Sequence, residues 1–268
     1  MRFFRFKNFM SMDTIKYLRY AIGEIILVVA GILIALQVNN YNEELNNKKL
    51  EKKILLSLHN EISSSLLNCN LVISKKREIV SSSNKIISEM SPDGNWDSKF
   101  KLDSLIFHVT NSGWRHVPQE GVLNEIINSG KLSIIEDIKI KNIVASLPQQ
   151  IAQIIEEDRL YRDDLHQYFL PYVSKNYKLR NITEFRELYK FSKSDLGKSR
   201  FQKSNQNLIN DLEFENILTI QSIWIKFSIE MCENLKIKFS KIQELIESKY
   251  DDVDYNTLNQ DLEEGFWG

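Results

Sequence analysis

An apolar segment near the start of the chain is the first feature of its hydropathy pattern. From Ala21 to Val38 only Glu24 and Gln37 interrupt a run of apolar residues. As a helix this run spans roughly 27 Å at 1.5 Å per residue, about the thickness of a bilayer core. A core helix of a soluble protein would show a polar face, which this run lacks. The pattern therefore predicts a transmembrane helix over residues 20–39.

A cleaved signal peptide is the main alternative for this segment. Cleavage needs small residues after a short apolar region, whereas Val29-Ala30-Gly31 lies in the middle of the run. We therefore expect an uncleaved signal anchor. The preceding residues 1–19 are rich in Arg, Lys and Phe, and positive charge favours the cytoplasmic side. We expect a single-pass protein of the inner membrane, with the N-terminus in the cytoplasm and the remaining chain in the periplasm.

Three positions inside the apolar segment are candidates for a role beyond anchoring. Glu24 is an intramembrane carboxylate, and such groups are costly and often functional. It lies in the first turn, where it could instead reach the interface or favour the positive helix N-terminus. Gly31 and Ala35 form a small-xxx-small pair that would let two such helices approach closely.

The rest of the pattern has a helical period. Residues 40–53 are mostly polar and predict a stalk that continues the membrane helix, and apolar residues then recur every three or four positions up to Met90. A second long segment, Asn207–Tyr250, contains no helix breaker and carries a similar stripe. We expect these two helices to pack antiparallel within a helical extracytoplasmic domain, residues 40–250. The acidic tail, residues 251–268, is expected either to be disordered or to dock on that domain.

Shorter helices are predicted between the two long ones. Ser-Pro-Asp-Gly-Asn at 91–95 predicts a turn, and Gly130 fits the left-handed position that follows a helix. Ser133-Ile-Ile-Glu136 reads as a capping box. The first two expected helices cover residues 100–109 and 118–128. The next begins at the capping box and ends before Pro148, and another covers residues 149–169. A short helix capped by Asn181-Ile-Thr-Glu184 and a polar loop over 192–205 follow. The predicted fold is an all-α bundle of antiparallel helices with a smaller helical insertion.

Composition supports helices and limits the classes of function. The chain has only 9 Gly and 4 Pro in 268 residues, too few for an all-β protein with many tight turns. Its formal net charge of -1 argues against a nucleic-acid partner bound by bulk charge. The expected partners are therefore the lipid bilayer and either a second copy of the chain or another envelope protein.

Several stretches resemble a bacterial family of single-pass membrane proteins with a domain of unknown function. These stretches are Met1–Arg5, Tyr20–Val29, Gly31–Asn40, Asn42-Glu43 and Asn128–Leu132. Members typically have Trp where Tyr41 stands, and the exchange keeps an interfacial aromatic ring. The resemblance implies a membrane-anchored, mostly helical protein. It brings no activity, cofactor or catalytic residue.

The residues that could carry chemistry are scattered along the chain. The phosphate-binding loop, nucleophile-elbow and zinc-protease motifs are missing. Trp114, Arg115 and His116 in an irregular loop are the best candidates for binding an anion or a polar ring, although Trp114 could simply plug the end of the bundle. We expect His59 and Glu61 on a solvated helix face, and Glu156-Glu157-Asp158 in solvated ion pairs with nearby arginines.

Cys69 and Cys232 lie on the two long helices that are expected to pair. In an oxidising periplasm they could form a disulfide if the register brings them together. Otherwise they are small buried apolar residues. Two cysteines at this spacing match no metal site.

The leading functional hypothesis is a membrane-anchored helical scaffold or interaction protein of the cell envelope, without a cofactor. A sensory or ligand-binding ectodomain centred on Trp114 and Arg115 is one alternative. A subunit of an ion-driven membrane complex that uses Glu24 is another. An enzyme is not expected, because no segment brings nucleophile, base and orienting group together.

Overall fold

The computed structural model describes residues 12–94, 96, 101–110, 114–183, 197–202 and 204–255, with side chains from residue 16 onward. The chain divides into two compact units, residues 1–53 and residues 54–268. Helices are the regular secondary structure of the described residues, which include no strand, so the all-α prediction is confirmed. Most of the N-terminal aromatic and basic segment, the short helix predicted after the cap at 181–184 together with Glu184 itself, part of the loop at 192–205, and residues 256–268 of the tail lie outside the described residues.

The first unit contains the beginning of α1, Met12–Ile87. Its apolar side chains over residues 20–38 are exposed, for example Leu27 at 74% and Ile34 at 63%. Among the described residues, α1 is the one helix long and apolar enough to cross a membrane. Polar residues follow, and Lys48 and Glu44 form an exposed ion pair of 2.5 Å one turn apart. The stalk prediction is therefore correct in that no break interrupts the helix between residues 38 and 54.

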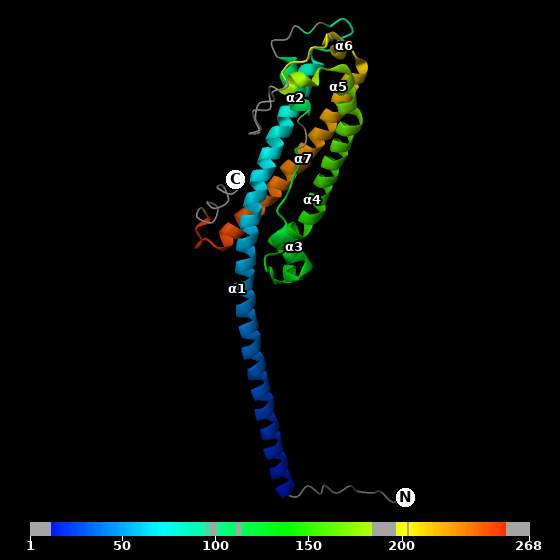
Figure 1. Cartoon of the computed structure of the whole chain (residues 1–268). Coiled ribbons are helices and arrows are strands. Elements are labelled where there is room, and N and C mark those ends of the chain that lie inside the picture. The colour runs from blue at the N-terminus through cyan, green and yellow to red at the C-terminus, as the bar shows by residue number, and fades with distance from the viewer. Residues whose placement is uncertain are drawn as a thin grey trace, which may run out of the picture. The chain divides into compact units, whose positions relative to one another are not determined.

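The second unit is an antiparallel bundle in which the 54–87 part of α1 lies beside α7, Leu212–Lys249 (Figure 1). His59 bonds to Glu247 at 2.8 Å, whereas Lys76, farther along α1, bonds to Ser228 near the middle of α7. Residue numbers that increase along α1 are therefore paired with residue numbers that decrease along α7. This confirms the predicted antiparallel pairing, and the long helix α4, Ile138–Asp164, packs against α7 as the third member.

The helical period explains why these three helices associate. Each carries a stripe of apolar side chains at intervals of three and four, and these stripes form the core. Fully burying one such side chain contributes about 1.5–3 kcal/mol. The core residues include Leu55, Leu58, Ile62, Val72 and Ile79 of α1; Ile140, Val144, Leu147, Ile151 and Ile154 of α4; and Leu218, Ile225, Leu235, Ile242 and Ile246 of α7.

Shorter helices close one end of the bundle (Figure 1). They are α2, Leu102–Thr110, α5, Leu170–Asn176, and α6, Gln206–Ile209. Phe169, Tyr172 and Phe214 join the core there, and the rings of Tyr172 and Phe214 stack with centroids 5.3 Å apart. The helix α3, Gly121–Asn128, and the 3₁₀ turn η1, Lys131–Ile134, lie at the other end of the bundle (Figure 1), so the short helices do not form the single insertion that was predicted.

Two predicted boundaries around Pro148 are wrong. The capping box at Ser133–Glu136 does not begin a helix: Ser133 stays in η1, and Asp137 caps α4 by accepting from the amide of Lys139 at 2.7 Å. The helix also continues through Pro148. Proline inside a helix costs about 3 kcal/mol, but Val144, Leu147 and Ile151 are all buried around it. Their burial outweighs the lost hydrogen bond.

The predicted stop near Pro171 is replaced by a π-helical turn. This turn, η2 over Leu165–Phe169, joins α4 directly to α5, and the amide of Leu170 bonds to the carbonyl of Leu165. Pro171 has no amide N–H and cannot continue a regular α-helical ladder. A wider turn ahead of it accommodates the ring without ending the helix.

Gly130 has φ +75°, so the prediction of a left-handed residue after α3 is correct.

Candidate functional site

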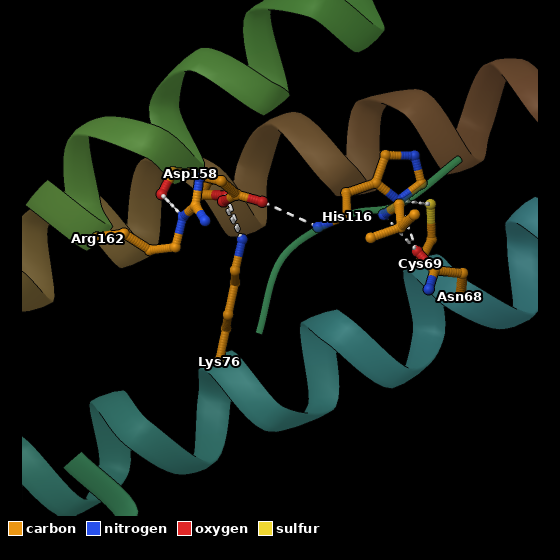
Figure 2. Close-up of polar contacts among 8 residues, drawn as sticks. Asn68, Cys69, Lys76, His116, Asp158 and Arg162 are labelled. Carbon is orange, nitrogen blue, oxygen red and sulfur yellow. Dashed lines mark hydrogen bonds and ion pairs between the residues drawn. The ribbon is translucent and has the colours of Figure 1, made fainter. Parts of the chain in front are cut away.

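A cluster of polar side chains crosses the core of the second unit and joins α1, α4, α7 and the loop at 114–120 (Figure 2). We define the Lys76 cluster as Lys76, His116, Asp158 and Ser228. All four are almost fully buried. Charged residues are rarely buried unless they are paired, so their contacts decide what this cluster can do.

The carboxylate of Asp158 is the centre of the cluster. Lys76 pairs with Oδ1, and Ser228 also donates its hydroxyl hydrogen to Oδ1 at 2.6 Å. The backbone N–H of His116 donates to Oδ2 at 2.9 Å, as Figure 2 shows. Lys76 donates in addition to Ser228 Oγ at 2.5 Å. The two charges thus neutralise each other, and hydrogen bonds occupy both carboxylate oxygens, which is the arrangement that makes a buried ion pair tolerable.

The imidazole of His116 extends the polar contacts toward Asn68 and Cys69 on α1. Its Nδ1 lies 2.9 Å from Asn68 Oδ1, which also accepts from the amide of Val117 at 3.1 Å. Since Oδ1 is an acceptor, Nδ1 carries the hydrogen. Burial lowers the pKa of His116 to about 4, aided by Lys76 and opposed by Asp158. The ring is therefore neutral near pH 7, and Nε2 is buried without a hydrogen-bond partner.

The two cysteines lie in the core beside this cluster as free thiols. Cys69 Sγ is 3.6 Å from His116 Nδ1. Burial raises the pKa of Cys69 to about 12 and that of Cys232 to about 11, so neither is a thiolate near neutral pH. After burial, the charge of Cys232 is the next cause of the raised pKa of Cys69, so the two thiols lie near each other.

A small cavity of about 270 Å³ borders the cluster on its outer side. Arg115, His116, Glu120, Asp158 and Arg162 are among its lining residues. Arg162 also contacts the backbone carbonyl of Asp158 at 3.4 Å. Burial, followed by the charge of Glu61, raises the pKa of Glu120. Two guanidinium groups, those of Arg115 and Arg162, and two carboxyl groups, those of Glu120 and Asp158, therefore line the same cavity.

A family model, described as a family of unknown function (DUF6090), matches residues 24–223. The chain belongs to this family. The matched range contains most of the apolar segment of α1, all of α4 and the first part of α7. No curated protein and no solved structure matches the chain.

The predicted binding residues of this DUF6090 member separate in the structure. Trp114 packs against the core residues Ile79, Tyr161 and Ile225, with the ammonium of Lys75 5.9 Å from its ring centroid. Arg115 is exposed at the cavity, and His116 turns into the core. The loop thus has a cavity beside Arg115. Trp114 packs in the bundle and does not line that cavity.

The candidates on the apolar segment belong to the first unit. Glu24, Gly31 and Ala35 are exposed positions of α1. Gly31 and Ala35 are one turn apart, so they share a face of the helix. The space around Gly31 is open within 4 Å. All three remain predictions.

One prediction about solvated charges is wrong and a second is correct only in part. His59 is buried and bonds to Glu247, and the carboxylate of Glu61 accepts from the amides of Val122 at 2.6 Å and Leu123 at 2.9 Å. Glu61 of α1 therefore caps α3, an interaction that no local pattern indicates. In the acidic cluster, Glu156 forms the expected exposed ion pair with Arg159 at 2.8 Å, but Asp158 points into the core.

The buried ion pair carried a signal that the sequence interpretation missed. Lys76 occupies a core position of its stripe, between Val72 and Ile79. Asp158 does the same on α4, between Ile154 and Tyr161. A charged residue at a stripe position on each of two helices indicates a buried pair. Among the described residues, no group of three or more His, Cys, Asp or Glu side chains could hold a metal ion.

Proposed function

We propose that this DUF6090 member is a membrane-anchored scaffold or interaction protein of the bacterial cell envelope. The apolar part of α1 anchors the chain, and the helical domain presents a surface to a second copy or to another envelope protein. The buried Lys76–Asp158 pair supports this role because it ties α1 to α4 and so fixes the shape of the surface.

The observation that carries the proposal is an apolar face left exposed on α7. Ile223, Phe227 and Ile237 are 46%, 50% and 67% exposed. Their spacing places all three on one side of the helix. Exposed apolar groups that share a face are a common feature of protein interaction surfaces.

Photocrosslinking in native membranes tests the proposal. A photoreactive phenylalanine analogue at Phe227 should yield a discrete crosslinked product, and mass spectrometry would identify it as a second copy or another protein. The same analogue at Glu156, an exposed polar position of α4, is the matched control. Recovery of monomers alone from the Phe227 variant would contradict the proposal.

The proposed location is the inner membrane, with a single span over residues 20–39 and the helical domain in the periplasm. An excess of Lys and Arg before the span supports this orientation. A reporter that is active only in the periplasm, fused after Gly268, should therefore be active. An inactive reporter with the fusion intact in the membrane would reverse the orientation.

A ligand-binding ectodomain is the second candidate, favoured by the cavity of about 270 Å³ beside Arg115. Arg115 and Arg162 could together hold a small anion. Inorganic phosphate should then raise the melting temperature of the wild-type protein and have no effect on the Arg115→Ala variant. An ion-driven complex that uses Glu24 is the remaining alternative, and it requires the Glu24→Gln variant to lose function at normal expression.

A further inference from the structure

A second and larger hollow lies where the π-helical turn passes into α5. We call it the α5 groove. It has a volume of about 860 Å³, and its walls come from η2 and α5 on one side and from the first half of α7 on the other. Small-molecule sites typically measure roughly 300–1,000 Å³. Its lining residues differ from those of the cavity beside Arg115.

The π-helical turn shapes one wall of the groove. Residues of a π turn are displaced from the α-helical progression, so they point where a regular helix would place another side chain. Tyr168, within this turn, is 57% exposed and lines the groove. Tyr172 is fixed from below, since its hydroxyl donates to Asp211 Oδ2 at 2.5 Å and its ring stacks on Phe214. Trp224 of α7 lines the opposite wall.

Unpaired polar atoms mark the floor of the groove. Asp164 is a lining residue, and its Oδ2 is buried without a hydrogen-bond partner. The side-chain amide of Gln221 is fully buried next to Asp164. Its Nε2 and Oε1 atoms also have no hydrogen-bond partner within the usual distance and angle limits. Buried polar groups without partners are rare in native proteins. Burial raises the pKa of Asp164, and the neighbouring amide of Gln221 partly opposes this shift. A positive charge bound beside the carboxylate would stabilise its ionised form.

The charges and rings of the groove favour a cation. Two carboxylates, Asp164 and Glu213, line it together with one ammonium group, that of Lys175. The faces of Tyr and Trp rings attract cations, and three such rings line the same space. Leu212, Ile217 and Ile220 supply an apolar surface beside them.

We propose that the α5 groove binds a small organic ammonium compound, an amine with an aromatic or aliphatic body. The ammonium group pairs with Asp164, and the body packs on Tyr168 and Trp224. The residues that the scaffold proposal uses, Ile223, Phe227 and Ile237, do not line this groove, although the rings of Phe227 and Trp224 are neighbours with centroids 6.5 Å apart. Loss of amine binding through Asp164 therefore leaves the scaffold proposal standing, and the reverse also holds.

Calorimetric titration of the full-length protein in mild detergent tests the site. Phenethylamine should bind, whereas 2-phenylethanol, which is neutral, and 3-phenylpropionate, which is an anion, should bind at least about tenfold more weakly. Equal binding of the three compounds, or no binding of phenethylamine, would overturn the proposal. Competition by glycerophosphoethanolamine would assign the ammonium to a lipid headgroup, and no competition would assign it to a soluble amine.

Matched variants separate the groove from general effects on folding. Asp164→Asn keeps the shape of the side chain and should weaken phenethylamine binding at least about tenfold. Asp163→Asn, the neighbouring exposed carboxylate that pairs with Arg159, should bind like the wild type. If Asp164→Asn lowers the helix content, Tyr168→Ala serves instead, since Tyr168 is largely exposed, and it should also weaken binding. Unchanged affinity in the folded variants would exclude Asp164 and Tyr168 from the site.

Discussion

Lys76 and Asp158 lie 82 residues apart in the chain, and they meet in the bundle core with side chains that are 0% and 3% exposed. One belongs to α1 and the other to α4, so the pair joins two helices that are distant in sequence. The hydroxyl of Ser228 adds α7 to the same contact. A charge at this position is stable only while its partner is present.

Asp158→Asn should therefore destabilise the protein by about 3–5 kcal/mol, because it leaves the Lys76 ammonium buried without an opposite charge. The measurement is the melting temperature of the full-length protein in detergent, followed by tryptophan fluorescence. Asp163→Asn on the same helix is the control, with an effect within about 0.5 kcal/mol. The double variant Lys76→Met, Asp158→Asn should recover much of the loss, and equal effects of the two single aspartate variants would refute the role of the pair.

Glu61 should determine the stability of the N-terminus of α3. Its carboxylate accepts from two backbone amides that have no partner within the helix, and losing such a cap costs about 0.5–2 kcal/mol. In Glu61→Ala, the amides of Val122 and Leu123 should exchange hydrogen with solvent several-fold faster. Glu125→Gln removes an exposed charge from α3 itself and should leave their exchange unchanged. Identical exchange in Glu61→Ala and wild type would show that the cap contributes nothing.

The buried imidazole of His116 predicts a loss of stability in mild acid. Its pKa is about 4 in the folded protein against an ordinary value of 6.5, so between these values the unfolded chain binds a proton that the folded chain does not. Stability therefore falls as the pH drops from 6.5 toward 4, by up to about 3 kcal/mol.

Unfolding by urea at a series of pH values measures this contribution. His116→Asn keeps a donor near the Nδ1 position and should flatten the profile between pH 6.5 and 4. His166→Asn, at an exposed position of η2, should follow the wild-type profile. A steep profile that persists unchanged in His116→Asn would assign the acid sensitivity to other groups.

Both thiols should resist alkylation in the native protein. Cys69 and Cys232 are fully buried, and their raised pKa values keep them protonated near neutral pH. Iodoacetamide at pH 8 should label neither thiol until denaturant is added, and then label both without a reducing agent, as mass spectrometry would report. Labelling of denatured protein only after reduction would instead reveal a disulfide.

Much of the fold could be predicted from the sequence because a helix produces a pattern among residues that are close together in the chain. The stripes on α1 and α7, the lack of breakers and the left-handed Gly130 each depend on residues a few positions apart. The antiparallel pairing also followed, since two long apolar faces must cover each other. The boundary predicted at Pro148 is wrong because the local cost of a proline, about 3 kcal/mol, was weaker than the burial of Val144, Leu147 and Ile151. The start predicted at Ser133 is wrong because Asp137 caps α4 instead.

The sequence by itself determined that the chain is helical, where its apolar segment lies and which helix faces are apolar, since all of these follow from the order of neighbouring residues. Only the tertiary structure decided that Lys76 meets Asp158, that Glu61 caps α3 and that Asp164 opens into a groove. The first two contacts join residues that are 82 and 61 positions apart in the chain and follow no repeating pattern. The packing of helices sets them, because only packing fixes which turns of two helices lie opposite each other.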